Sequence, residues 1–307
     1  MNVAVVGHSV CLPGGFAPGD AVPADGDWFD VKERLGRRGY RQLPLPAQLT
    51  LAAVRGLVPE GSAGDAPDPG DEVPAHRRGV WLGSSTAAAH CLAELDRRIL
   101  AEGTESLPPT GAPYFSVNLV PARAVNELGA TGPSVTVTST GTAVLDAVAC
   151  AVRALRLGHV DEAIVVAVEV PDEMRADGAP AECGAIALRL RAGESGGLLR
   201  SSSAFVAGEP ATAAERVHAG LASQAPVLVA GPGGAAPGGP LAAFARLVAA
   251  LRAGDDLAVV LTDATGAASG VDLAHAPVAP AGTAPGTSGT TSGSVTAPAL
   301  VTTSQGA

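Results

Sequence analysis

Residues 132–157 decide the fold, and they read Gly-Pro-Ser-Val-Thr-Val-Thr-Ser-Thr-Gly-Thr-Ala-Val-Leu-Asp-Ala-Val-Ala-Cys-Ala-Val-Arg-Ala-Leu-Arg-Leu. The alternation of Thr and Val over Val135–Thr138 predicts a strand. Thr142–Leu157 predicts a helix with apolar residues on every side, which is typical of a buried helix, and Gly158 suits its end. The turn at 139–142 would then lie at the positive end of that helix, where a cysteine thiolate is stabilised. No cysteine is there.

Strands and helices alternate along most of the chain, which predicts an α/β fold with a buried sheet. The expected strands are 2–6, 79–82, 134–138, 162–168 and 185–190, and the expected helices are 45–57, 86–102, 117–128 and 142–157. Right-handed crossovers would bring the loops that follow the strands to one rim. Gly7–Cys11 follows the first strand but lacks the second glycine of a hydrolase nucleophile elbow. We therefore expect a strand-to-loop turn there.

The C-terminal part repeats this pattern in a shorter form. A strand at 198–206, helix 211–222, strand 226–230, helix 241–252 and a hairpin of 257–262 with 269–273 are expected. Residues 276–307 carry no charge and are rich in Ala, Pro, Gly, Thr and Ser, which predicts disorder. The predicted organisation is therefore an N-terminal half (1–190), a reduced C-terminal half (191–275) and a tail (276–307).

Composition excludes several classes of partner. The net charge of −10 argues against binding to nucleic acid or to an anionic membrane. No stretch of 18 apolar residues free of charge occurs, so we expect a cytoplasmic protein. The four cysteines lack paired spacing and are expected to be reduced. Gly231-Pro-Gly-Gly234 lacks the lysine of a phosphate loop, and the sequence indicates neither a cofactor nor a metal site.

The central stretch carries a family resemblance. Its pattern Gly-Pro-x-x-Thr-Val-x-Ser/Thr-x-Cys-x-x-x-Leu-x-Ala, followed by Arg-x-Gly-x-x-Asp-x-Ala, resembles the β-ketoacyl synthases of the thiolase superfamily. The matching residues are Gly132, Pro133, Thr136, Val137, Ser139, Leu145, Ala147, Arg156, Gly158, Asp161 and Ala163. The resemblance covers about the first 190 residues. It implies a thiolase-like fold of two pseudo-repeated α/β halves, layered α-β-α-β-α, with the second half shortened here.

The same resemblance indicates that the catalytic residues are missing. The family's acyl-accepting cysteine falls on Gly141. The histidine of its His-Gly-Thr-Gly-Thr motif falls on Ala230, and the segment for its second histidine is missing from the shortened half. All six histidines of the chain lie outside both motifs. Losing the nucleophile and both bases together predicts that condensation has been abandoned.

The hydroxyls of Ser139, Thr140 and Thr142 surround the empty position and are candidates to line an acyl pocket. A hydroxyl nucleophile needs an adjacent base, and the sequence shows none. Cys150, nine positions into the predicted buried helix, and Cys183 are both expected to pack in the core.

Two main classes of function remain. The first is a non-catalytic subunit, similar to a chain-length factor, that pairs with an active ketosynthase in polyketide or fatty-acid-like biosynthesis. The resemblance implies pairing through the strand of Val135, Thr136, Val137 and Thr138, with an acyl carrier protein engaged only indirectly, through the partner. The second is a residual thiolase-fold acyltransferase or thioesterase that uses the hydroxyls near Gly141. A stand-alone structural homologue is a third possibility.

Overall fold

The computed structural model describes residues 2–14, 22, 28–36, 40–57, 73–107, 116–171, 181–193, 197–221, 223–232, 234, 236 and 238–275. The tail predicted at 276–307 lies outside these residues. All described elements belong to one unit, Met1–Ala276.

The first half of the chain contributes five strands. They are β1 (Val3–Cys11), β2 (Arg78–Gly83), β3 (Ser134–Val137), β4 (Glu162–Glu169) and β5 (Gly184–Ala192), in the order β3-β2-β4-β5-β1. Strand β2 is parallel to β3 and β4, whereas β5 is antiparallel to both β4 and β1. The strand β3 therefore stands at the end of the sheet.

The second half repeats this pairing with one strand fewer. Its strands are β6 (Gly197–Phe205), β7 (Val227–Ala230), β8 (Leu257–Thr262) and β9 (Ala267–His275), in the order β6-β9-β8-β7. Strand β7 is parallel to β8, and β9 is antiparallel to β8 and β6. This order matches β1-β5-β4-β2, and the described residues of the second half contain no counterpart of β3. The predicted pseudo-repeat and the shortening of the second half are thereby confirmed.

A short ladder joins the two halves. Residues Val3–Val5 of β1 pair antiparallel with Gly197–Leu199 of β6, so that the strands form one nine-stranded sheet. Strand β1 therefore has β5 on one side and β6 on the other.

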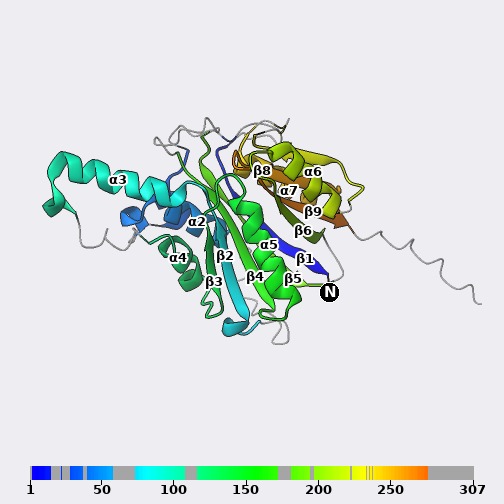
Figure 1. The fold of residues 1–307 in the computed structure, drawn as a ribbon. Helices are drawn as coiled ribbons and strands as arrows, with labels where there is room; N and C mark the ends of the chain where they lie inside the picture. Colours follow the sequence, from blue (N-terminus) through cyan, green and yellow to red (C-terminus); the bar gives the residue numbers. More distant parts are fainter. Residues whose placement is uncertain are drawn as a thin grey trace, which may run out of the picture. The chain divides into compact units, whose positions relative to one another are not determined.

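The longer helices form the layers around the two half-sheets (Figure 1). Helices α2 (Leu45–Arg55) and α4 (Leu119–Glu127) cover the outer face of the first half, and α6 (Pro210–Leu221) covers that of the second. Helices α5 (Ala143–Arg156) and α7 (Pro240–Ala253) lie between, because each contacts strands of both halves. The order of layers is the α-β-α-β-α order predicted for a thiolase-like fold. The remaining elements are α1 (Val31–Leu35), α3 (Ala87–Glu102) and three 3-10 turns at Tyr40–Gln42, Ala75–Arg77 and Thr104–Ser106.

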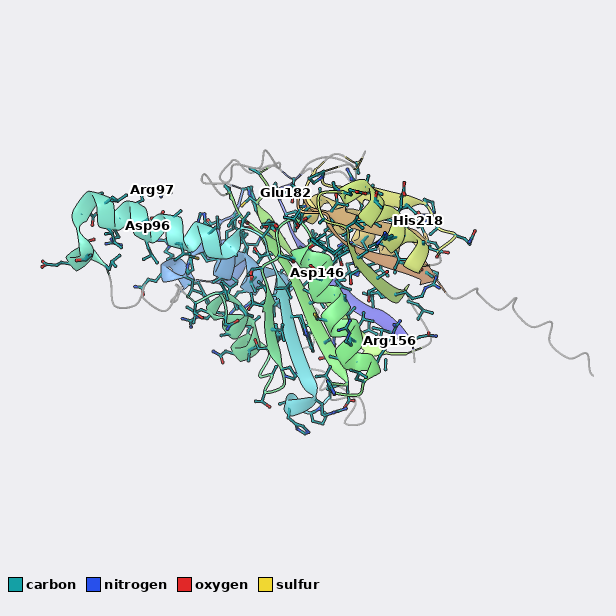
Figure 2. The ribbon with its side chains drawn as sticks, in the orientation of Figure 1. Asp96, Arg97, Asp146, Arg156, Glu182 and His218 are labelled. Carbon is teal, nitrogen blue, oxygen red and sulfur yellow. The ribbon has the colours of Figure 1, made fainter. Side chains whose placement is uncertain are left out.

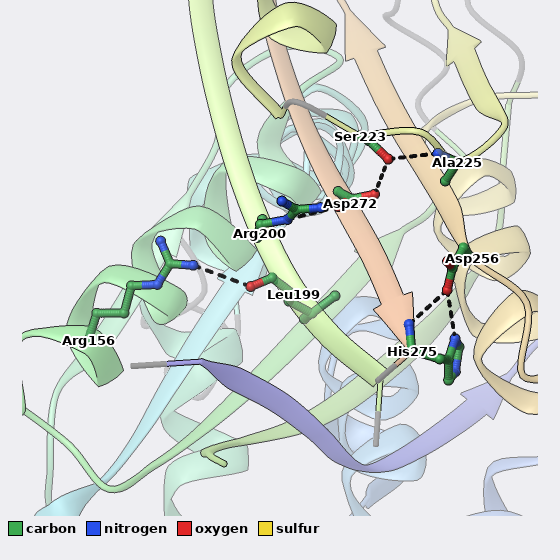
Figure 3. A network of polar contacts seen from close by, with 8 residues as sticks. All are labelled: Arg156, Leu199, Arg200, Ser223, Ala225, Asp256, Asp272 and His275. Carbon is green, nitrogen blue, oxygen red and sulfur yellow. Dashed lines mark hydrogen bonds and ion pairs between the residues drawn. The ribbon is translucent and has the colours of Figure 1, made fainter. Parts of the chain in front are cut away.

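A buried ion pair and a serine hydroxyl link β6, β9 and the segment that precedes β7 (Figure 3). Asp272 of β9 is fully buried, and its cross-strand neighbour on β6 is Arg200. The guanidinium of Arg200 donates two hydrogen bonds to Asp272 Oδ2, at 2.5 and 3.0 Å. Ser223 Oγ donates to Asp272 Oδ1 at 2.5 Å. The segment between α6 and β7 is thereby tied to the β6–β9 pair.

Two details differ from the sequence-based expectations. Gly7–Cys11, predicted as a turn, continues β1, because these residues pair with β5 beyond a bulge between Val5 and Gly7. Cys150, predicted in the core, is exposed. Asp146 and Arg153 lie four residues before it and three after it, so the three residues share one outward face of α5. The apolar face of α5 is therefore narrower than its composition indicated.

No helix among the described residues is long and apolar enough to cross a membrane. The four cysteines are free thiols, and Cys183 is buried as predicted.

Candidate functional site

The turn that joins β3 to α5 places Gly141 at the start of the buried helix. Gly141 has φ +76°, in the left-handed region that favours glycine. A Cβ at this position would lie 2.9 Å from the carbonyl oxygen of Thr262 and 3.1 Å from Cβ of Asp263. The space that a side chain would use is therefore partly filled by the carboxyl end of β8.

The hydroxyls on either side of Gly141 turn toward a carboxylate of α5 (Figure 2 labels Asp146). Ser139 Oγ donates to Asp146 Oδ2 at 2.6 Å, and Thr142 Oγ1 lies 2.8 Å from the same oxygen. The two hydroxyl oxygens are 3.3 Å apart. Thr142 is buried, whereas Ser139 is half-buried. No base was predicted next to these hydroxyls, but the helical spacing from Thr142 to Asp146 brings a carboxylate into contact with them.

The third candidate hydroxyl bonds to the other half of the chain. Thr140 Oγ1 donates to Asp263 Oδ2 at 3.1 Å. Asp263 Oδ1 accepts from Thr265 N, Thr265 Oγ1 and Ala267 N, which fixes the turn between β8 and β9. Burial acts to raise the pKa of Asp263, but the hydrogen bonds from Thr265, Ala267 and Thr140 outweigh it and lower the pKa. The carboxylate is therefore held in its ionised form.

Ala230, which the resemblance aligns with the family's first histidine, also contacts β8. Ala230 ends β7 and is fully buried. Gly231 follows with φ +98°, and a Cβ there would lie 2.3 Å from the carbonyl oxygen of Thr262. The hydroxyl of Thr262 is 2.7 Å from the carbonyl oxygen of Pro232 and 3.3 Å from that of Ala230. The turns after β3, β7 and β8 thus converge on Thr262, as expected for loops on one rim.

No histidine contributes to this convergence in the part of the chain that the structure describes. His8 Nε2 lies 2.8 Å from Nε of Arg252, His90 Nδ1 contacts the carbonyl of Pro171, and His275 contacts Asp256. The described residues also contain no group of three or more His, Cys, Asp or Glu side chains that could hold a metal ion.

The predicted dimer strand is an edge strand. Within the described sheet β3 has a neighbour on one side only, β2. Val80 N and Ser84 N donate to the carbonyls of Pro133 and Val137. Because the backbone alternates along a strand, the N–H and C=O of Thr136 face the open side. Thr138, just beyond β3, is exposed.

A small apolar pocket lies beside this edge. Its empty volume is about 280 Å³, part of which is solvent at its mouth. The pocket is lined from β2, β3, α3 and α4 by Leu82, Ser84, Ala87, Cys91, Ser116, Val117, Val120, Thr136 and Thr138. Of the three hydroxyls proposed to line an acyl pocket, Ser139, Thr140 and Thr142, none lines this one.

Comparison with known proteins agrees with this geometry. The family model for the N-terminal domain of β-ketoacyl synthases matches residues 64–213. Over this range, just under half of its length, the chain is similar to β-ketoacyl synthases. Over 158 residues, 49% of the chain, it is 34% identical to a curated protein of Streptomyces coelicolor named as an actinorhodin polyketide β-ketoacyl synthase. The alignment covers only 32% of that relative, so the chain spans about a third of its length.

Solved structures share the fold of this ketosynthase-like chain. The ishigamide ketosynthase/chain length factor matches 90% of it with a TM-score of 0.68 and 17% identity, over 99% of the solved chain. A ketosynthase of a type II polyketide synthase, solved with its acyl carrier protein, covers the same shares with a TM-score of 0.68 and 13% identity. A ketosynthase from Xenorhabdus doucetiae in complex with its chain length factor gives a TM-score of 0.52, with 13% identity over 89% of this chain and 99% of the solved one. At these identities the likeness concerns the fold.

Proposed function

We propose that this ketosynthase-like chain is a non-catalytic, chain-length-factor-like subunit that pairs with an active β-ketoacyl synthase in the cytoplasm. The partner would carry out the condensation in polyketide or fatty-acid-like biosynthesis, and this chain would shape the acyl pocket. The observation that carries the proposal is the juxtaposition of an open strand edge at β3 with a turn that presents Gly141 where the resemblance puts a nucleophile.

The open edge of β3 supports pairing with another chain. Edge strands offer unpaired N–H and C=O groups to a second strand, and β3 leads directly to the turn at 139–142. A partner strand added here would also cover the mouth of the apolar pocket, because Thr136 and Thr138 belong to both features.

The charge of the chain supports binding of the acyl carrier protein by the partner subunit. The chain carries 30 acidic and 20 basic residues. Like charges repel at an interface, so an acidic acyl carrier protein would dock on the partner rather than here.

Co-expression with an intact type II ketosynthase, followed by size-exclusion chromatography, tests the pairing. We expect the wild-type chain to co-elute with the ketosynthase. Thr138→Lys places a charge at the exposed end of the edge strand and should abolish co-elution. Ala219→Lys adds the same charge on the exposed face of α6 and should leave co-elution intact. A wild-type chain that is well folded alone and never co-elutes with the ketosynthase refutes the proposal.

A second function has one observation in its favour. The contact of Ser139 with Asp146 gives a half-buried hydroxyl a carboxylate partner, which is the minimum for a hydroxyl nucleophile. In that case the chain is a residual acyltransferase or thioesterase. However, Asp146 lies in the first turn of α5, where the positive end of the helix favours a negative charge. Its contacts with Ser139 and Thr142 are those expected of a carboxylate that fixes the turn.

Thioester hydrolysis by the purified chain separates the two functions. The subunit proposal predicts no turnover above the uncatalysed rate. Turnover that is lost in Ser139→Ala and kept in Thr140→Val would establish the residual enzyme instead.

A further inference from the structure

Two buried glutamates at the ends of neighbouring strands lie outside the candidate site. Glu169 ends β4, and Glu182 precedes β5, its antiparallel neighbour. Their exposed fractions are 2% and 3%. We call them the acid pair. Buried carboxylates are rare unless their oxygens are bonded, so the contacts of each one indicate what it does.

Glu182 caps a helix that is 57 to 60 residues away in sequence. Its Oε1 accepts hydrogen bonds from Gly239 N at 3.0 Å and Ala242 N at 2.9 Å, and its Oε2 accepts from Leu241 N at 2.8 Å. These N–H groups lie at the start of α7, where no intrahelical partner exists. The cap residue of α7 is Gly239, which has no side chain to offer, and Pro240 has no N–H. Glu182 therefore supplies the N-terminal cap that the local sequence lacks.

The geometry of this cap is tight. A Cβ on Gly239 would lie 2.6 Å from Glu182 Oε2. The φ of Gly239 is −99°, which any residue can adopt. Glycine is required at position 239 by its closeness to the carboxylate rather than by backbone conformation.

Glu169 anchors a different helix. Its Oε1 accepts from Ser85 N and Ser85 Oγ, and its Oε2 accepts from Thr86 Oγ1 at 2.6 Å. These residues form the turn that begins α3, between the pocket residues Ser84 and Ala87. Glu169 thus anchors the turn beside the pocket, and Glu182 anchors the helix that lies between the two halves.

We propose that the acid pair is a proton switch: binding of one proton to Glu182, which alone caps the start of α7, rearranges the hydrogen bonds that anchor this helix. A carboxylate accepts all three N–H bonds, whereas a protonated carboxyl group turns one oxygen into a donor. The cap on α7 is then weaker, while the cost of a buried negative charge disappears. The proposal concerns this chain alone and does not depend on a partner.

The surroundings of Glu182 set the pH range. Burial raises the pKa of Glu182 to about 7, against the opposing effect of the N–H groups of Leu241, Ala242 and Gly239, and the charge of Glu169 adds to the rise. From β1, the neighbouring strand of β5, the titratable group is the thiol of Cys11, and burial raises its pKa to about 11. The Cys183 thiol next to Glu182 likewise has its pKa raised by burial to about 11, so both stay neutral. On α7, Arg246 is more than one turn from the cap and has interactions of its own, and Arg252 contacts His8.

Proton binding by Glu182 is linked to folding, and this linkage sets the direction in which stability changes with pH. The pKa of Glu182 is higher in the folded chain than the ordinary 4.5. The group therefore contributes stability that is fully present below pH 4.5 and is lost as the pH rises through about 7.

The test measures unfolding by denaturant and amide hydrogen exchange on the full chain at pH values below and above 7. In the wild type we expect the midpoint of unfolding to fall as the pH rises through about 7. Exchange of the amides of Gly239, Leu241 and Ala242, corrected for the intrinsic rate, should be faster on the acidic side. Glu182→Gln should abolish both dependences. Glu215→Gln, on the exposed face of α6, should keep them.

A second variant covers the case in which Glu182→Gln does not fold. Glu169→Gln removes the neighbouring charge, so it should move the midpoint of the pH dependence to lower pH. Infrared spectroscopy of the wild type should show a protonated carboxyl band that disappears through the same pH range. If Glu182→Gln folds and keeps the pH dependence of the wild type, or if the wild type shows no protonated band, the proton switch is excluded.

Discussion

Thr140 and Asp263 are joined by a hydrogen bond of 3.1 Å across 123 positions of sequence. This bond fastens the turn that would hold a nucleophile to the hairpin of the second half. Together with the approach of Gly141 to the carbonyl of Thr262, it closes the region where the resemblance puts a catalytic site. Several measurable consequences arise from this closure and from the charges around it.

Substitution of Gly141 should cost more stability than substitution of a glycine with the same backbone but free space. Gly141 and Gly158 have φ of +76° and +69°, and a Cβ on Gly158 would meet no atom within 4 Å. Gly158→Ala should lose about 1–2 kcal/mol through the left-handed backbone alone. Gly141→Ala should lose more, because its Cβ also meets the carbonyl of Thr262. Denaturant unfolding of both variants measures the difference, and equal losses would mean that Thr262 does not crowd the turn.

Removal of the Asp263 charge should destabilise the chain in a pH-dependent way. Asp263→Asn weakens hydrogen bonds to a charged group, each worth about 1.5–3 kcal/mol, so we expect a loss of about that size at neutral pH. The folded-state pKa of Asp263 lies below the ordinary 3.8, so its contribution is present above that pH and lost as the pH falls. The gap between wild type and variant should therefore narrow in acid. A gap that stays constant down to the acid transition would contradict this account.

Neutralising the buried carboxylate of Glu162 should cost more stability than neutralising the neighbouring Asp161. The guanidinium groups of Arg78, Arg189 and Arg191 all bond to Glu162, at 2.6 to 2.8 Å, and Glu162 itself is buried. Burial acts to raise its pKa, but the hydrogen bonds from Arg191, Arg78 and Arg189 lower it overall.

Because Glu162→Gln removes a buried charge to which three guanidinium groups bond, we expect a loss of about 3–5 kcal/mol of unfolding free energy. The neighbouring Asp161→Asn breaks an exposed pair with Arg77 and should cost far less. Comparable losses in the two variants would show that burial of Glu162 does not matter.

Thiol labelling should distinguish one cysteine from the other three. Cys150 is exposed on α5, whereas burial raises the pKa of Cys11, Cys91 and Cys183 to about 11. A thiol reagent added to the native chain should modify one site rapidly, and Cys150→Ser should remove that reaction. Rapid labelling of the Cys150→Ser variant would indicate that a buried thiol is accessible.

Much of the fold follows from local patterns. The alternation at Val135–Thr138 and the glycine after Leu157 predicted β3 and α5 because both depend on neighbours in sequence. The outward face of α5 was misjudged at Cys150, since an Ala-rich helix gives little contrast between its faces. Pairing beyond Val5 depends on β5, more than 170 residues away, and nothing in Gly7–Cys11 itself shows it.

The contacts of the candidate site were less predictable. Asp146 could have been found from its helical spacing to Thr142. Asp263 bonds to Thr140, 123 positions away, and Glu182 bonds to Gly239, 57 positions away, with no local signal. Thr262 bonds to Pro232, 30 positions away, also without a local signal. The positions of Gly141 and Ala230 were predicted from a family resemblance, and their roles stay predictions.

The pairing of β1 with β5 and β6 affects how fast the chain folds. The ladder of β1 with β5 runs from Cys11–Ala185 to Val3–Ala192, which is 174 to 189 positions of separation, and its ladder with β6 reaches Leu199. Contacts of such long range impose a large loop-closure cost before they give any stabilisation, so they slow folding. Until residues 185–192 have been synthesised, β1 has neither neighbour, and its unpaired backbone N–H and C=O groups stay open to aggregation. We therefore expect the yield of folded protein to depend on chaperones and on the pace of translation more than on the stability of the finished sheet.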